Sequence, residues 1–158
     1  MEEFDSVAEI LEFAIDREVQ ANEFYKILAD LAANPAMGEL ILEFAKEELE
    51  HKAKLELELM KIGKAVREEE KRQQAKELAK SKIFDYVADD QPRLDLQYED
   101  LLLWGMKKEK TSFRLYVDLA AIVRDEELRE TLLSLAEEEA KHKVQLEIEY
   151  DELAAKRR

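Results

Sequence analysis

The sequence predicts an all-α protein, a four-helix bundle in which one long crossover joins the second and third helices. The 158 residues are 46% hydrophobic and 41% charged but include only three glycines and two prolines, a composition typical of long amphipathic helices. Apolar residues recur at helical spacing in four segments, and the connections between them are short, long and short. This order favours one crossover over a simple up-and-down bundle, within a single domain of residues 1–158.

The first helix pair is expected over residues 5–63. Its first helix is predicted from about Asp5 to Ala33, and Asn34 followed by Pro35 provides a cap and first turn for the second helix. The second helix is predicted to end at Gly63. The residues expected to face inward on these two helices are Val7, Leu11, Ala14, Ala21, Leu28, Ala32, Ile41, Phe44, Leu55, Leu59 and Ile62.

Residues 64–96 form the expected crossover. Their first half is charged almost all round, and a short apolar patch precedes Pro92, which interrupts any helix. We expect an exposed helix in this segment. The charge density leaves a disordered linker as the alternative.

The second helix pair is expected over residues 97–154. The third helix is predicted from about Gln97 to Val123, and Asp125 is placed to cap the fourth. The residues expected to face inward are Leu102, Met106, Phe113, Ala120, Val123, Leu132, Leu135, Leu146 and Leu153.

The two helix pairs are copies of one another at a spacing of 91 residues. FAKEELEHK at 44–52 aligns with LAEEEAKHK at 135–143, without a gap. Each half carries a glutamate, a tyrosine seven residues later, and a Glu-x-x-His motif beginning thirty residues after that glutamate. Two such pairs pack as a pseudo-twofold bundle, so each inner feature is presented twice.

Six ionisable residues interrupt the apolar stripes of the four helices. They are Glu18, Glu48, His51, Glu109, Glu139 and His142. Residues three apart on a helix project side by side, so each Glu-x-x-His motif offers a carboxylate and an imidazole to one site. Four buried carboxylates repel one another, and no arginine or lysine is expected on the stripes to compensate.

Two divalent cations would balance the four carboxylates, so the sequence predicts a pair of metal ions in the core. Oxygen and imidazole donors without sulfur suit iron or manganese better than a structural zinc. The adjacent glutamates, expected to face solvent, are Glu47, Glu50, Glu137 and Glu138. The alternatives are a chance arrangement and a site that has lost its metals.

Tyr25 and Tyr116 lie two turns from Glu18 and Glu109 on the same helical faces. As candidate catalytic residues, they would donate hydrogen bonds to a metal-binding glutamate and serve as a source of protons. The alternative is that they are core aromatics whose hydroxyls donate a hydrogen bond to any available acceptor.

The composition also excludes several functions. A formal charge of −14 disfavours binding to nucleic acid or to an anionic membrane. The absence of cysteine excludes disulfides, a thiol nucleophile and an iron–sulfur cluster. The first residues lack the features of a signal peptide, and no apolar run approaches a membrane span, so a cytoplasmic location is expected.

The motifs EELEH at 47–51 and EEAKH at 138–142, with the two Glu–Tyr pairs, resemble those of the ferritin-like di-iron superfamily, and within it the erythrin domain of the rubrerythrins. The resemblance covers nearly the whole chain. It implies two iron ions per chain, with manganese or mixed metals remaining open. It implies that Glu48 and Glu139 bridge the metals, that Glu18 and His51 complete one site, and that Glu109 and His142 complete the other.

The chain departs from that family in two respects. Rubrerythrins generally carry a further metal-binding glutamate where this chain has Ser112, which implies a more symmetric centre. They also carry a four-cysteine rubredoxin domain; this chain has no cysteine and therefore no rubredoxin-type iron site. Leu49 replaces the haem-binding methionine of the similar bacterioferritins, so haem is not expected.

The resemblance implies a non-haem di-iron oxidoreductase that reduces hydrogen peroxide with electrons from a separate protein such as a rubredoxin. One alternative is a ferroxidase that handles iron with dioxygen. Another is a helical interaction module whose metal site is vestigial and whose charged crossover binds a partner. The resemblance favours a homodimer, and the long crossover would allow helix pairs to exchange between subunits.

Overall fold

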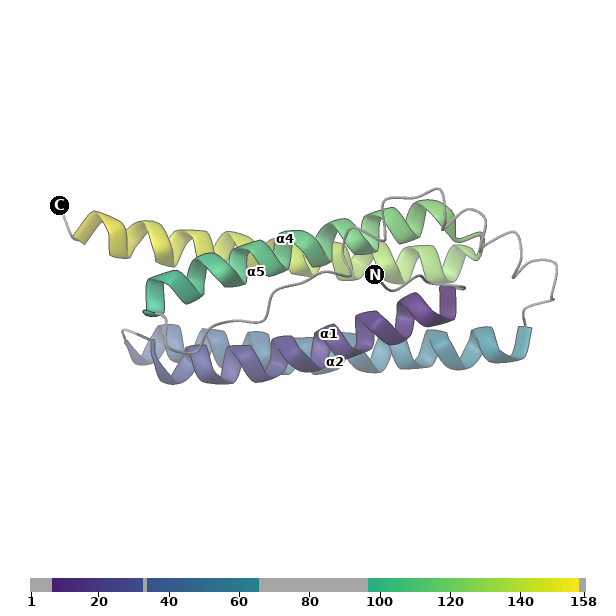
Figure 1. Cartoon of the computed structure of the whole chain (residues 1–158), viewed down its shortest axis with the longest axis horizontal. Coiled ribbons are helices and arrows are strands. Elements are labelled where there is room, and N and C mark those ends of the chain that lie inside the picture. The colour runs from purple at the N-terminus through teal and green to yellow at the C-terminus, as the bar shows by residue number, and fades with distance from the viewer. Residues whose placement is uncertain (1–6, 33, 66–96, 157–158) are drawn as a thin grey trace.

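The computed structural model describes residues 7–32, 34–65 and 97–156, and these form four long helices (Figure 1). The helices are α1 (Val7–Asp30), α2 (Pro35–Ala65), α4 (Tyr98–Ile122) and α5 (Glu126–Lys156). No strand occurs in the described ranges, so the all-α prediction is confirmed. The predicted start at Asp5 and the exposed helix predicted for the crossover lie outside the described residues.

The predicted caps are present at two helix starts. The Asn34 side chain accepts a hydrogen bond from the Met37 backbone N–H at 2.9 Å. Asp125 Oδ1 accepts hydrogen bonds from the backbone N–H groups of Glu127 at 2.9 Å and Leu128 at 3.2 Å. Side-chain oxygens that accept from the first helical N–H groups define where a helix begins, which is why these two boundaries were readable from sequence.

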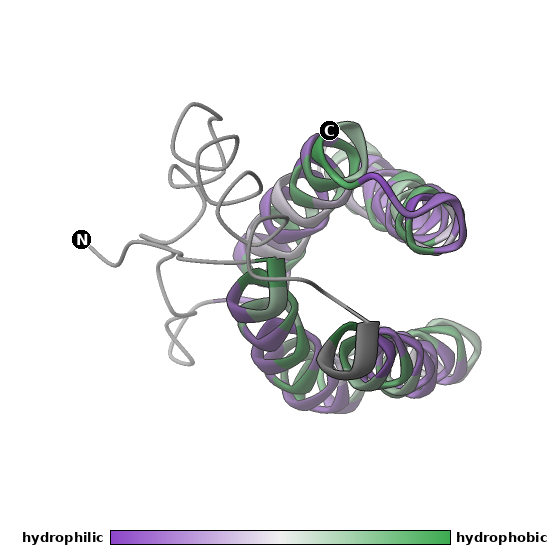
Figure 2. Ribbon diagram, turned by 90° about the vertical axis from the view of Figure 1, so that its right-hand side faces the viewer, coloured by the Kyte–Doolittle hydropathy of each residue, from purple (hydrophilic) through white to green (hydrophobic). Residues whose placement is uncertain are grey.

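The helices pack chiefly in two pairs, α1 with α2 and α4 with α5. Seen end-on, one pair lies above the other, and the core lies between them (Figure 2). Gly105 on α4 lets the pairs approach, because a Cβ there would lie 3.2 Å from both Phe24 of α1 and Leu146 of α5. No helix in the described part of the chain is long and apolar enough to cross a membrane.

The apolar core is divided into two clusters by a belt of polar residues. One cluster includes Leu11, Leu55 and Leu115, and the other includes Leu28 and Leu102. On every helix the predicted ionisable residues lie in sequence between members of the two clusters. The belt is therefore enclosed at both ends by apolar side chains that exclude water.

The prediction that Phe113 faces the core is wrong. Its side chain is 37% exposed, whereas Leu115 and Tyr116 are each 1% exposed. The core-facing side of α4 is turned towards Leu115 and Leu119, which places Phe113 on the outer flank of the helix. Regular spacing alone does not settle which edge of a broad apolar face becomes buried.

Candidate metal centre

All six ionisable residues predicted for the core are buried in the polar belt, each 3% exposed or less. Glu18 projects from α1 and Glu109 from α4, while each Glu-x-x-His motif projects from the middle of α2 or α5. The three- and four-residue spacing of these positions keeps them on the inner face of each helix. The fold thus brings all six predicted residues together.

Their side-chain atoms form two overlapping groups. One group comprises Glu18, Glu48, His51 and Glu139, and the other comprises Glu48, Glu109, Glu139 and His142. Within each group, one donor atom from every residue lies within 4.8 Å of the others. Glu48 and Glu139 belong to both groups, which is the arrangement expected of two carboxylates that bridge a pair of cations.

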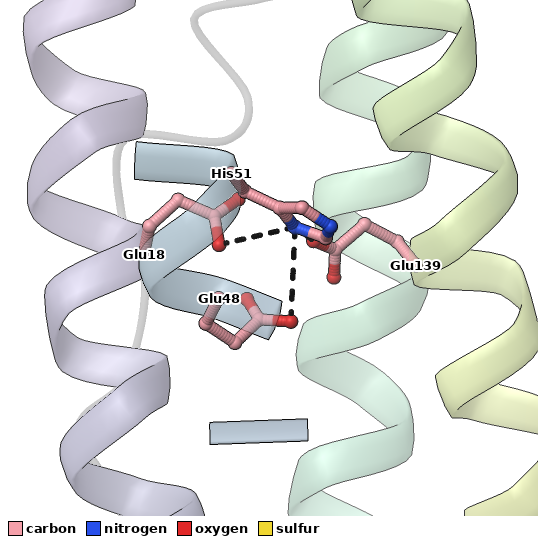
Figure 3. Close-up of side chains that lie close together, drawn as sticks. All are labelled: Glu18, Glu48, His51 and Glu139. Carbon is pink, nitrogen blue, oxygen red and sulfur yellow. Dashed lines mark hydrogen bonds and ion pairs between the residues drawn. The ribbon is translucent and has the colours of Figure 1, made fainter. Parts of the chain in front are cut away.

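Each imidazole turns its Nδ1 atom towards the centre. His51 Nδ1 lies 2.8 Å from Glu139 Oε1 and 3.5 Å from Glu18 Oε2 (Figure 3). His142 Nδ1 lies 3.0 Å from Glu48 Oε1 and 3.7 Å from Glu109 Oε1. The two halves therefore present the same donors in the same orientation.

The outer nitrogen of each imidazole contacts a glutamate from the opposite helix pair. His51 Nε2 lies 2.5 Å from Glu138 Oε2, and His142 Nε2 lies 2.5 Å from Glu47 Oε2. Both glutamates were predicted to face solvent, and they are partly exposed, but their carboxylates reach inward. A carboxylate that accepts a hydrogen bond from Nε2 keeps the imidazole proton on that nitrogen. The lone pair of Nδ1 is then available to bind a metal ion. The sequence feature that could have indicated this role is that Glu47 and Glu138 directly precede Glu48 and Glu139, the two glutamates expected to bridge the metals.

The two tyrosines join the halves by crossed hydrogen bonds. The Tyr25 hydroxyl on α1 donates to Glu109 Oε1 on α4, and the Tyr116 hydroxyl on α4 donates to Glu18 Oε1 on α1. Each tyrosine thus bonds the glutamate of the opposite half, rather than the one on its own helix. Burial, together with the neighbouring carboxylates, raises the pKa of both hydroxyls well above the usual value, so both retain their protons.

The expectation that no cation accompanies the glutamates is wrong, because Arg17 is buried next to them. Its side chain is 5% exposed and donates from Nη2 to Ser112 Oγ at 3.2 Å. Burial lowers its pKa, while Tyr116 and Glu18 oppose that shift. Arg17 precedes Glu18 in sequence and is not part of the predicted apolar stripe, but its hydrogen bond to Ser112 shows that it lies where α1 meets α4. One guanidinium offsets only part of the charge of four carboxylates.

Burial and mutual repulsion dominate the electrostatics of the two shared carboxyls. Burial, followed by the charges of Glu18 and Glu109, raises the pKa of Glu48 well above its usual range. Burial, followed by Glu109 and Glu48, does the same for Glu139. Burial also acts to raise the pKa of Glu18, but hydrogen bonds with Glu48 and His51 outweigh it and lower that pKa. Bound cations would remove this repulsion and displace the protons.

Several buried atoms at the centre make no hydrogen bond of good geometry, although a polar atom of a neighbouring residue lies close to some of them. They are Glu18 Oε2, Glu48 Oε1, Glu109 Oε2 and His142 Nδ1. Divalent cations bind carboxylate oxygens and imidazole nitrogens that are gathered in this way, and this donor set suits iron or manganese. The residues present therefore fit a metal pair.

A family model for rubrerythrin matches residues 9–150, which span the whole bundle and the centre. The chain belongs to the rubrerythrin family. The chain also resembles the solved structure of a hypothetical protein from Pyrococcus furiosus, with a TM-score of 0.70 and 24% identity over 95% of this chain and 91% of that one. That likeness concerns the fold alone. Comparison with curated proteins found no match.

Replacing Glu138 by alanine is expected to weaken metal binding about 10- to 100-fold, the usual effect of losing a carboxylate that orients a metal-binding histidine. The reason is that His51 Nε2 loses the partner that holds its proton and its ring orientation. The measurement is a metal titration of the purified protein. Glu137→Ala is the control, because this adjacent side chain is 71% exposed and forms an ion pair with exposed Lys141. Equal affinities for the two variants would contradict the assignment.

Proposed function

We propose that this protein is a non-haem di-iron oxidoreductase that reduces hydrogen peroxide. The observation that carries the proposal is the pair of overlapping Glu/His groups, closed off by apolar clusters and built symmetrically from both halves of the chain. Glu48 and Glu139 would bridge two ions. Glu18 with His51, and Glu109 with His142, would complete the two sites. A pair of ferrous ions would supply the two electrons that convert one peroxide molecule and two protons to two water molecules.

The residues around the centre would hold its carboxylates and manage protons. Tyr25 and Tyr116 keep their hydroxyl protons and donate hydrogen bonds to Glu109 and Glu18. These bonds would fix the two terminal carboxylates in the orientation that binding requires. They would also place a protonated hydroxyl on each side of the centre, where protons are needed to convert peroxide to water.

The chain contains no cysteine, so it has no second iron site of the rubredoxin type. We propose that electrons to restore the reduced centre come from a separate protein. This requirement distinguishes the proposal from ferroxidation, in which the iron that is oxidised is itself the source of electrons.

The test begins with metal analysis of protein purified without added metal, where we expect about two irons per chain. Anaerobically reduced protein is then mixed with peroxide, and separately with dioxygen, in a stopped-flow spectrometer. We expect faster oxidation by peroxide than by dioxygen, and faster than for the same concentration of free ferrous ion. Faster oxidation by dioxygen would favour ferroxidation. Absence of any rate advantage over free ferrous ion would overturn the proposed activity.

A further inference from the structure

A groove on the outer surface of the α4–α5 pair combines positive charge with exposed apolar side chains. It has a volume of about 320 Å³ and is lined by Lys110, Phe113, Arg114, Ala140, Lys143 and Val144. Phe113 is 37% exposed and Val144 is 50% exposed. Among the residues that the structure describes, no acidic side chain lines this groove, although the whole chain carries a formal charge of −14.

The basic character of the groove departs from the internal repeat. On the α1–α2 pair, the positions equivalent to Lys110 and Arg114 are Val19 and Glu23. The equivalent of Phe113 is Asn22, whose side chain is buried and donates to the Ala45 carbonyl at 2.7 Å. The centre itself is repeated almost without change. The outer surface of the α4–α5 pair therefore differs in charge from that of the α1–α2 pair. The packing of two similar helix pairs does not require this difference.

The charges that line the groove are available to a partner. Lys110 and Arg114 are exposed and form no ion pair with another residue in the described ranges. Lys143 is paired with Glu147 on the next turn of α5. Two unpaired cations beside an exposed phenyl ring form a surface that an acidic partner with a small apolar contact area would recognise.

The groove lies at the same level along α4 and α5 as the metal centre. Lys110 follows Glu109, Ala140 follows Glu139, and Lys143 follows His142 in sequence. A partner in the groove would therefore contact the same stretches of α4 and α5 that carry three residues of the centre on their inner faces. This closeness is what electron transfer needs, and it is why an electron carrier fits the groove better than a purely structural partner.

We propose that an acidic electron-carrier protein docks in the α4–α5 groove and delivers electrons to the centre. The inference rests on the proposed function, which requires an external donor. Two reduced carriers would each lose one electron, and the two electrons would return the oxidised metal pair to its reduced form without a bond being made or broken. The rest of the protein surface is largely acidic and would repel the carrier. The position of the groove would therefore determine where the carrier docks and in which orientation.

Binding is tested with a redox-inert probe, a rubredoxin of net negative charge that holds zinc in place of iron. Its Kd for the metal-loaded protein is measured by calorimetry at low and high salt. We expect Lys110→Glu combined with Arg114→Glu to weaken binding at low salt by at least about tenfold. The control is Lys26→Glu combined with Lys54→Glu, which makes the same change in net charge at exposed positions of α1 and α2. We expect the control to change the Kd less than about twofold.

Two further measurements complete the test. Phe113→Ala should weaken probe binding while leaving its salt dependence unchanged, since this variant removes apolar contact without removing charge. The reduced iron form of the same rubredoxin should reduce the oxidised wild-type centre at a rate that falls with added salt. The groove variant should lose that dependence. Thermal melting and metal content of each variant verify that the fold and the centre are intact.

Three outcomes would overturn the inference: no weakening in the groove variant, equal weakening in both double variants, or salt-sensitive self-association in sedimentation that the groove variant abolishes. The last would assign the groove to a contact between copies of this chain. Because the zinc probe undergoes no redox reaction, its binding is read independently of peroxide reduction. If the protein binds the probe in the groove but does not consume peroxide, the proposed activity is refuted and the docking site is not.

Discussion

Glu48→Gln is expected to abolish binding of the metal pair and to stabilise the metal-free protein. Glutamine keeps the shape of the side chain but cannot supply the bridging carboxylate that both donor groups share. The variant should therefore lose all of the stabilisation that metal gives the wild type, about 2.7 kcal/mol at a free metal concentration one hundred times the Kd.

The opposite effect on the metal-free protein follows from burial. Glu48 is 1% exposed, and burial, Glu18 and Glu109 raise its pKa well above the usual range. Ionisation of this group in the folded protein is unfavourable, and a neutral amide removes that penalty. Thermal melting with and without metal measures both effects, with exposed Glu50→Gln on the same helix as the control. Equal metal content in the two variants would contradict the assignment of Glu48.

The stabilisation provided by metal is expected to increase with pH. In the metal-free fold, Glu48 and Glu139 have raised pKa values, chiefly because of burial. Burial acts to lower the pKa of His51 and His142, but hydrogen bonds and charges from neighbouring carboxylates outweigh it and raise both values. A group whose pKa is higher in the folded than in the unfolded protein stabilises the fold below its unfolded pKa. That stabilisation is lost as pH rises through the folded pKa.

The metal-free protein should therefore lose stability as pH rises above about 4.3 through the glutamates and above about 6.5 through the histidines. Glu18, with its lowered pKa, acts in the opposite direction and offsets part of the loss. Metal binding requires deprotonated carboxylates and neutral imidazoles, so it strengthens over the same range and releases protons.

The measurement for this pH dependence is the difference in Tm between metal-loaded and metal-free protein at several pH values. A complementary titration in weakly buffered solution should show acidification on metal addition. The expected result is a larger Tm difference at pH 8 than at pH 5.5. A Tm difference that does not change with pH would show that the buried groups do not hold protons in the metal-free protein.

Much of the bundle and the residues of its centre could be predicted from the sequence alone. Helix limits near Asn34 and Asp125 were readable because caps act between residues three or fewer apart. The six core residues were found because 3.6-residue periodicity places them on the inner faces, and the 91-residue repeat places them there twice. These features could be predicted because they depend on the spacing of residues within one helix, or on the sequence similarity of the two halves.

Contacts between the helices were decided only by the tertiary structure. The crossed bonds of Tyr25 to Glu109 and of Tyr116 to Glu18 depend on how α1 meets α4. So does the burial of Arg17 beside the centre. No local pattern encodes these pairings, because the partners lie 84 and 98 residues apart in sequence.

The outer surface shows the same division. The sequence determined that this chain has a symmetric acidic core suited to two cations, because spacing and charge are properties of single helices. Only the packed structure placed Phe113 outside rather than inside, since the rotation of α4 about its own axis is decided by the side chains that it meets. That rotation creates the groove which distinguishes the two halves of an otherwise repeated protein.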